Sequence, residues 1–218
     1  MLETVKTTIL VVSALFPIVN PLGGSPIFLA LTRDYSRRSR RLLAQRIAMN
    51  CFILLTASFL TGTHVLAFFG ISLPVVQVGG GLIVISTGWS LLKQKEEEDD
   101  RGRAHRDVER QDILRHAFYP LTLPLTVGPG SISVAITLGA NAPRLSVANL
   151  LATLGAVIGS ALIAVSVFLC YGFADRLAKL LGATGMSVIM RLSSFLLVCI
   201  GVQILWNGAS VLLGSLAK

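Results

Sequence analysis

Two stretches of the chain decide its fold: residues 16–28 read FPIVNPLGGSPIF, and residues 119–132 read YPLTLPLTVGPGSI. In both, an aromatic residue and a proline are followed by Pro-Leu and then by a cluster of glycine, serine and proline. Each stretch lies inside a long apolar run, yet so many prolines and glycines cannot continue one regular helix. A freed backbone group in lipid costs several kcal/mol unless it is paired. Both stretches are therefore predicted to be buried in protein or to line a polar cavity.

The composition places these stretches in a membrane protein. The chain has 218 residues, of which 53% are hydrophobic and 14% charged, and its mean hydropathy is +0.74. An ordinary soluble domain has about 25% charged residues, so a soluble globular protein, a disordered chain and a disulfide scaffold are excluded. The three cysteines all lie inside apolar runs. The net charge of +8 is interpreted as a topology signal in the connectors, not as a nucleic-acid site.

The apolar runs predict six membrane-spanning helices, because about 20 residues of helix cross a hydrocarbon core of about 30 Å. The expected spans are 4–31, 43–68, 73–93, 113–139, 146–173 and 187–214. Of the 19 basic residues, fifteen are assigned to the connectors of one side and three to the other, and Arg191 lies just inside the last span. By the positive-inside rule, both termini are predicted to face away from the cytoplasm, which a reporter fused at Lys218 would test.

The two quoted stretches predict an internal repeat. Each opens a unit of three spans, residues 1–93 and 113–218, and the charged segment 94–112 links them on the cytoplasmic side. An odd number of spans inverts the second unit in the membrane, as in many secondary transporters. The expected fold is therefore an all-α membrane protein of six transmembrane helices in two inverted three-helix repeats, with spans 1 and 4 broken at the Gly/Pro motifs.

Broken spans supply groups that bind small zwitterions. New half-helices are expected to open at Ser25-Pro26 and Gly130-Ser131, where free N–H groups and the positive dipole end suit a carboxylate. The carbonyls before them, around Val19-Asn20 and Thr122-Leu123, suit an ammonium group or Na⁺. Asn20 is predicted to contact a ligand or ion, with a helix–helix hydrogen bond as the alternative. The competing interpretation is that both motifs only kink structural helices.

The polar residues inside the runs limit the chemistry. None of the apolar runs contains Asp or Glu, which disfavours a carboxylate proton relay and an acidic cation pore. Metalloprotease, serine-nucleophile and P-loop motifs are missing from the sequence. The protein is therefore expected not to be an enzyme and to need no metal or other cofactor.

These motifs resemble those of the MarC family of integral membrane proteins. The resemblance rests on NPLGGSP after Phe-Pro, on PLTVGPGSI, and on MSVIMRLSSFLLVCIGVQILWNG at residues 186–208. It departs where Leu123-Pro124 stands in place of Met-Pro, and where Ser193-Ser194 stands in place of Met-Gly. The resemblance implies six spans in two inverted halves and, for some members, transport of small neutral amino acids. It implies a substrate site at Asn20, Pro21, Gly23, Gly24, Ser25, Pro26, Pro124, Thr126, Gly128, Pro129, Gly130 and Ser131.

The expected function is secondary transport of a glycine- or alanine-like amino acid across the bacterial inner membrane by alternating access. Its partners are the lipid bilayer and a zwitterionic substrate, and no nucleic acid is expected. Coupling to H⁺ or Na⁺, the direction of transport and self-association are left open. The alternatives are an exporter or channel for another small metabolite or drug, and a non-transporting membrane assembly protein.

Overall fold

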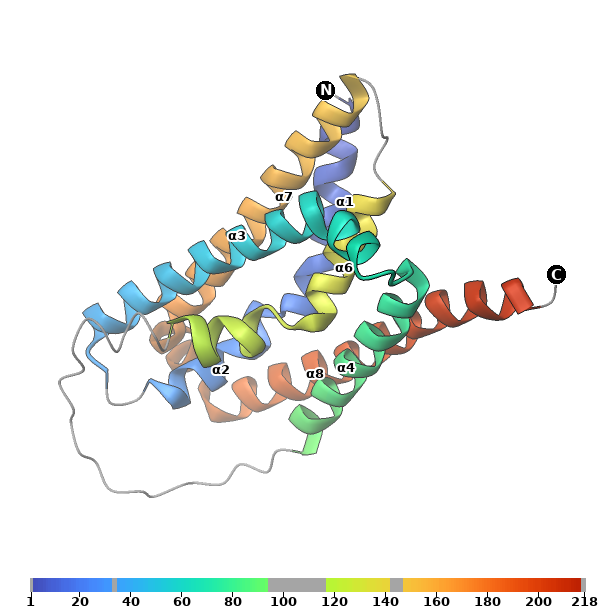
Figure 1. Cartoon of the computed structure of the whole chain (residues 1–218). Coiled ribbons are helices and arrows are strands. Elements are labelled where there is room, and N and C mark those ends of the chain that lie inside the picture. Colours follow the sequence, from blue (N-terminus) through green and yellow to red (C-terminus); the bar gives the residue numbers. More distant parts are fainter. Residues whose placement is uncertain (1, 33–34, 94–116, 142–146, 217–218) are drawn as a thin grey trace.

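The computed structural model describes residues 2–32, 35–93, 117–141 and 147–216, and within these ranges it contains helices and no strands (Figure 1). The predicted linker 94–112 lies outside the described residues. The elements in chain order are α1 (Leu2–Val19), α2 (Pro21–Leu31), α3 (Arg37–Phe68), α4 (Leu73–Lys93), η1 (Ala117–Thr126), α6 (Pro129–Ala140), α7 (Val147–Gly172) and α8 (Ala174–Leu216).

The helices have the length and surface of membrane spans. Within the described residues, five are long and apolar enough to cross a bilayer: Leu2–Leu31, Arg37–Phe68, Leu73–Lys93, Leu150–Gly172 and Thr184–Ser215. A sixth span results if η1 and α6, bent by 69° relative to each other, are counted as one. Large apolar side chains cover the outside, with Phe68 84% and Leu180 83% exposed. This confirms an all-helical membrane protein of five or six spans.

Several helix boundaries differ from those expected. Helix α3 begins at Arg37, not near residue 43, because the Ser36 side chain accepts from the Ser39 amide at 3.1 Å and caps the helix. Helix α8 begins at Ala174 and is interrupted at Gly182, whose φ of 66° is left-handed. The half-helices open at Pro21 and Pro129, each just after a capping residue, instead of at Ser25-Pro26 and Gly130-Ser131.

Small residues let two pairs of helices pack closely. Helix α4 runs antiparallel to α8, and a Cβ on Gly81 would lie 2.6 Å from the Leu205 amide nitrogen. Helix α1 runs alongside α7, where Thr8 Oγ1 donates to the Gly155 carbonyl at 3.0 Å. Helix association in lipid depends on such close backbone approach. Gly81, Gly155 and Gly159 all lie at such close contacts, where an added Cβ would meet the neighbouring helix.

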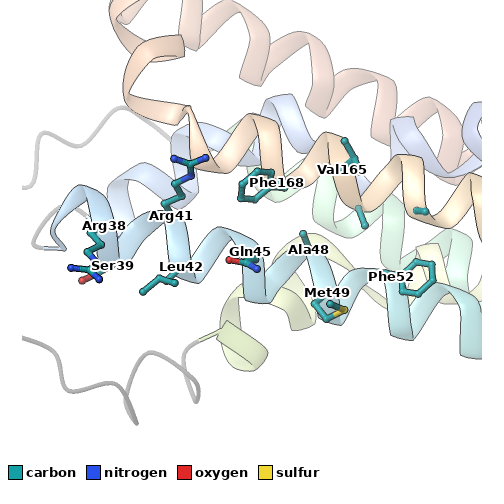
Figure 2. Close-up of a pocket in the computed structure, with 12 residues that line it drawn as sticks. Arg38, Ser39, Arg41, Leu42, Gln45, Ala48, Met49, Phe52, Val165 and Phe168 are labelled. Carbon is teal, nitrogen blue, oxygen red and sulfur yellow. The ribbon is translucent and has the colours of Figure 1, made fainter.

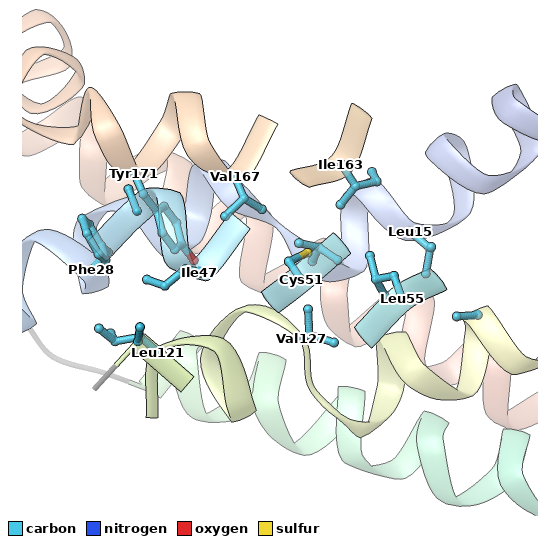
Figure 3. Close-up of a cluster of buried hydrophobic side chains, with 14 of the residues drawn as sticks. Leu15, Phe28, Ile47, Cys51, Leu55, Leu121, Val127, Ile163, Val167 and Tyr171 are labelled. Carbon is cyan, nitrogen blue, oxygen red and sulfur yellow. The ribbon is translucent and has the colours of Figure 1, made fainter. Parts of the chain in front are cut away.

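The core lies where the interrupted helices meet α3 and α7 (Figure 3). It joins side chains from both halves of the chain, and fully buried members include Leu15, Phe28, Ile47, Cys51, Leu55, Val127, Ile163, Val167 and Tyr171. Deep burial of this region satisfies the requirement that irregular backbone at membrane depth be enclosed in protein.

Arg40 fixes the end of α2. Its guanidinium donates to the carbonyls of Thr32 at 3.0 Å and Tyr35 at 3.2 Å, just beyond the C-terminus of α2. It also forms an ion pair with Asp175 in the first turn of α8. A cation at a helix C-terminus and an anion at a helix N-terminus both complement the helix dipole, so one side chain holds α2, α3 and α8 together.

Candidate functional site

The first interruption is a single residue, Asn20. Its φ of 48° and ψ of 57° are left-handed, a conformation that Asn tolerates better than most residues. Its amide donates to the Phe16 carbonyl and its own carbonyl accepts from Gly24, both at 2.9 Å. The Asn20 Oδ1 accepts from the Gly23 amide at 3.1 Å. The N-terminus of α2 is therefore already occupied by a side-chain acceptor.

This interruption leaves acceptors open on the other side. Pro21 has no N–H, so the Pro17 carbonyl has no amide four residues later to accept from. In the described part of the chain, no backbone amide reaches the Ile18 or Val19 carbonyl, and Asn20 Nδ2 has no hydrogen-bond partner. These groups resemble the exposed end of a discontinuous transporter helix.

The second interruption is longer and built differently. Tyr119 and Leu123, each followed by a proline, have extended backbone conformations, as the residue before proline prefers. Threonine hydroxyls satisfy two backbone carbonyls of this segment. Thr122 Oγ1 donates to the Ala117 carbonyl at 2.6 Å, and Thr126 Oγ1 donates to the Leu121 carbonyl at 2.7 Å. Asn50 Nδ2 donates to Thr122 Oγ1 at 3.3 Å and joins the segment to α3.

The N-terminus of α6 has no side-chain cap. Gly128 occupies the capping position with φ −94° and ψ 175°, and it has no side chain to offer. Pro129 is the first helical residue, and the first backbone bond of the helix runs from the Ile132 amide to the Gly128 carbonyl at 3.1 Å. The amides of Gly130 and Ser131 therefore remain donors without intrahelical partners. An uncapped helix N-terminus attracts a negatively charged group.

A cavity of about 340 Å³ lies between the two interruptions. Eight of the twelve predicted site residues line it: Asn20, Gly24, Pro124, Thr126, Gly128, Pro129, Gly130 and Ser131. The volume is at the lower end of the range for small-molecule sites, about 300–1,000 Å³. That these residues bind a substrate stays a prediction.

Four predicted residues do not line the cavity: Pro21, Gly23, Ser25 and Pro26. A Cβ on Gly23 would lie 2.4 Å from Asn20 Nδ2, so Gly23 faces its own cap. Ser25 is buried and its Oγ donates to the Cys170 carbonyl of α7 at 3.3 Å. Ser25 therefore joins two helices instead of opening a half-helix.

The far wall of the cavity consists of residues that were not predicted from the sequence. Helix α4 contributes Ile83, Val84, Thr87 and Leu91, and α8 contributes Leu197. Apolar side chains on a span look the same in sequence whether they face lipid or a cavity. The run of glycines at 79–81 was the available signal, since Gly80 faces Ser133 of α6 so closely that a Cβ would lie 2.6 Å from its Cβ.

Tyr171 of α7 connects the two interruptions and was also missed. Its hydroxyl lies 3.1 Å from Thr126 Oγ1 of the second motif. Its ring stacks on Phe28 of α2, with the centroids 4.7 Å apart. A Cβ on Gly24 of the first motif would lie 2.4 Å from the Tyr171 hydroxyl oxygen. Gly24 therefore makes room for a side chain that contacts both halves.

Fold and site together define a multi-spanning helical membrane protein with a small cavity between two interrupted helices. Over residues 5–213 the chain matches the family described as MarC family integral membrane protein, and it belongs to that family. It is similar to a "UPF0056 membrane protein" of Aquifex aeolicus, with 32% identity over 92% of this chain and 91% of the relative. It is also similar to the "UPF0056 inner membrane protein MarC" of Escherichia coli, with 30% identity over 95% of this chain and 96% of the relative. No solved structure matches the chain.

Proposed function

We propose that the protein is a secondary transporter of small neutral amino acids, such as glycine and alanine, in the bacterial inner membrane. The observation that carries this proposal is the cavity of about 340 Å³ between two interrupted helices. Transporters of this kind place their substrate at discontinuous helices near the middle of the membrane. The inner membrane is the location given in the name of the E. coli relative.

The groups around the cavity suit a zwitterion. The substrate carboxylate would accept from the free amides of Gly130 and Ser131 at the start of α6. Its ammonium group would donate to the open carbonyls of Ile18 and Val19 and approach Asn20. Gly24, Gly128 and Gly130 line the cavity without side chains, so a ligand can approach the backbone closely while a bulky side chain is excluded.

Alternating access requires two halves that move against each other, and the helix contacts support two inverted repeats. Helix α1 packs on α7 as η1 packs on α3, and α2 packs on α8 as α6 packs on α4. Of the other large contacts, α3 with α7 and α4 with α8 pair equivalent helices of the two halves, and the contact of α3 with α6 has its equivalent in that of α7 with α2. The proposed movement is a rocking of these halves about the cavity, with the basic connectors on the cytoplasmic side.

We propose transport in preference to catalysis, because the residues that line the cavity offer amide, hydroxyl and carbonyl groups and no titratable side chain. Transport assays determine the direction of transport and whether H⁺ or Na⁺ is the coupling ion. An exporter or channel for another small metabolite or drug would use the same cavity, and a substrate panel separates it from an amino acid carrier.

The test is counterflow in proteoliposomes that contain the purified full-length protein. Vesicles loaded with unlabelled glycine, alanine or serine should accumulate the same labelled amino acid, and vesicles loaded with leucine or phenylalanine should not. Protein-free vesicles are the control. Lack of counterflow for all three small amino acids by folded protein would overturn the proposal.

A further inference from the structure

A second concave site lies on the outside of the molecule, in the groove between α3 and α7 (Figure 2). Its volume is about 1170 Å³, and it shares no lining residue with the central cavity. One end is polar and the remainder apolar. The lining from α3 is Arg38, Ser39, Arg41, Leu42, Gln45, Ala48, Met49 and Phe52, and that from α7 is Ala161, Ala164, Val165 and Phe168.

The arginines at the polar end are available to a ligand. Arg40, between them in sequence, is buried and paired with Asp175, but Arg38 and Arg41 form no ion pair with any described residue. The Arg41 guanidinium carbon lies 6.0 Å from the ring centroid of Phe168, which itself lines the groove. Both arginines stand near the N-terminus of α3, where the helix dipole adds further positive potential.

The apolar end has the length of one lipid leaflet. From Leu42 to Phe52 the helix rises about 15 Å at about 1.5 Å per residue, which is half of a hydrocarbon core of about 30 Å. The floor of this part is formed by small side chains, Ala48 of α3 and Ala161 and Ala164 of α7. An apolar groove of this length that ends at two arginines without ion pairs among the described residues matches an acyl chain joined to a phosphate.

We propose that this groove binds an anionic phospholipid, with the headgroup phosphate on Arg38 and Arg41 and one acyl chain along α3 and α7. Charge complementarity selects this occupant, because the residues that line the groove include two arginines and no carboxylate. In a phospholipid, the phosphate provides negative charge for the two arginines, and the acyl chain covers the apolar residues of the groove.

The test is native mass spectrometry of the full-length protein, titrated with phosphatidylglycerol and with phosphatidylethanolamine of the same acyl composition. Wild type should bind phosphatidylglycerol about tenfold more tightly, given the attraction of anionic lipid to each basic residue near the surface. The double variant Arg38→Gln/Arg41→Gln should bind both lipids equally. The matched control, Arg37→Gln/Arg46→Gln, removes two exposed arginines of the same helix that do not line the groove and should keep the preference.

A variant with a larger side chain in the groove tests the acyl-chain site separately. Ala161→Leu narrows the floor and should weaken binding of both lipids, whereas Leu162→Phe on the neighbouring exposed position should not. Equal binding of the two lipids by wild type, or equal loss in the control pair, would overturn the proposal. The lipid proposal would also be overturned if the protein were a dimer without bound lipid and Ala161→Leu converted it to a monomer. That result would assign the groove to a second copy of the chain. None of these readouts depends on transport.

Discussion

The two interruptions begin from the same sequence signal and end with different structures. At the first, α1 and α2 form one candidate span, Leu2–Leu31, and one left-handed residue, Asn20, separates them and caps α2 with its own side chain. At the second, η1 and α6 meet at 69°, and the start of α6 carries Gly128 and no cap. Asn20 against Gly128 is the decisive difference, because it determines which helix N-terminus is free to bind a negatively charged group.

The two halves leave different backbone groups open. The first half offers carbonyls, which suit a cation. The second half offers open backbone amides, which suit an anion. Two motifs with identical caps would present the same charge to both ends of a ligand. The asymmetry between otherwise similar motifs therefore fits a dipolar ligand.

The largest effect is expected for Gly130→Ala in the second motif. A Cβ there would lie 2.0 Å from Val84 Cγ2 across the cavity. Overpacking of this kind costs about 1–3 kcal/mol, and we expect the melting temperature to fall and counterflow to drop about tenfold. The measurements are thermal unfolding in detergent and glycine counterflow.

Two further variants on α4 provide a rescue and a control for Gly130→Ala. Val84→Ala should restore part of the counterflow of Gly130→Ala by removing the clashing methyl groups. Gly79→Ala on the same wall helix, where a Cβ meets nothing within 4 Å, should behave as wild type. Full transport by the single Gly130→Ala variant would mean that α6 does not pack on α4 as described.

The next prediction makes the second interruption resemble the first. Gly128→Ser places a hydroxyl at the capping position, where the extended backbone suits serine, and it should accept from the Gly130 or Ser131 amide. The apparent KM for glycine should rise about tenfold, since a hydrogen bond to a charged group is worth about 1.5–3 kcal/mol. Protein stability should rise slightly or stay constant, because glycine is replaced by a better cap.

The steric control for this variant is Gly128→Ala. Its Cβ would lie 3.3 Å from the Pro124 carbonyl oxygen, as the serine Cβ would, but it brings no acceptor. Its KM should therefore change less than that of Gly128→Ser. Equal changes in both would show that bulk, and not occupation of the amides, controls affinity, and the assignment of the carboxylate to α6 would be wrong.

The third prediction concerns the left-handed residue of the first interruption. Asn20→Gly removes the cap and keeps a residue that adopts φ 48° readily, whereas Asn20→Ala also introduces left-handed strain of about 1–2 kcal/mol. We expect melting temperatures in the order wild type, Asn20→Gly, Asn20→Ala. An alanine variant as stable as the glycine variant would mean that α1 and α2 form one continuous helix.

The sequence predicted that both motifs matter, but not how they differ. Proline and glycine content indicates where a helix cannot continue, and this placed Asn20, Gly128 and Gly130 around one cavity. Asn20-Pro21 and Ser25-Pro26 each combine a good capping residue with a proline at the first helical position, so NPLGGSP alone does not select between them. The wall from α4 and α8 could not be predicted, because the orientation of an apolar side chain on a span depends on helix packing.

The smallest effect is expected at Tyr171, which contacts both interruptions. Thr126 gives its one hydroxyl hydrogen to the Leu121 carbonyl, so Tyr171 must be the donor in their contact at 3.1 Å. Tyr171→Phe keeps the stack on Phe28 and the space that Gly24 leaves, and it removes only this hydrogen bond. The expected loss of stability is about 1 kcal/mol, the net value of a typical hydrogen bond.

A double-mutant cycle with Thr126→Val sharpens this prediction. If Tyr171 and Thr126 act only through each other, adding Tyr171→Phe to Thr126→Val should cost much less than adding it to wild type. Thr126→Val alone should cost more than Tyr171→Phe, because it also leaves the Leu121 carbonyl unpaired in a buried segment. Additive losses would mean that the tyrosine hydroxyl is paired elsewhere and that α7 does not link the two motifs. A coupled loss, by contrast, would confirm that the Tyr171 hydroxyl of α7 is bonded to Thr126 of the uncapped interruption.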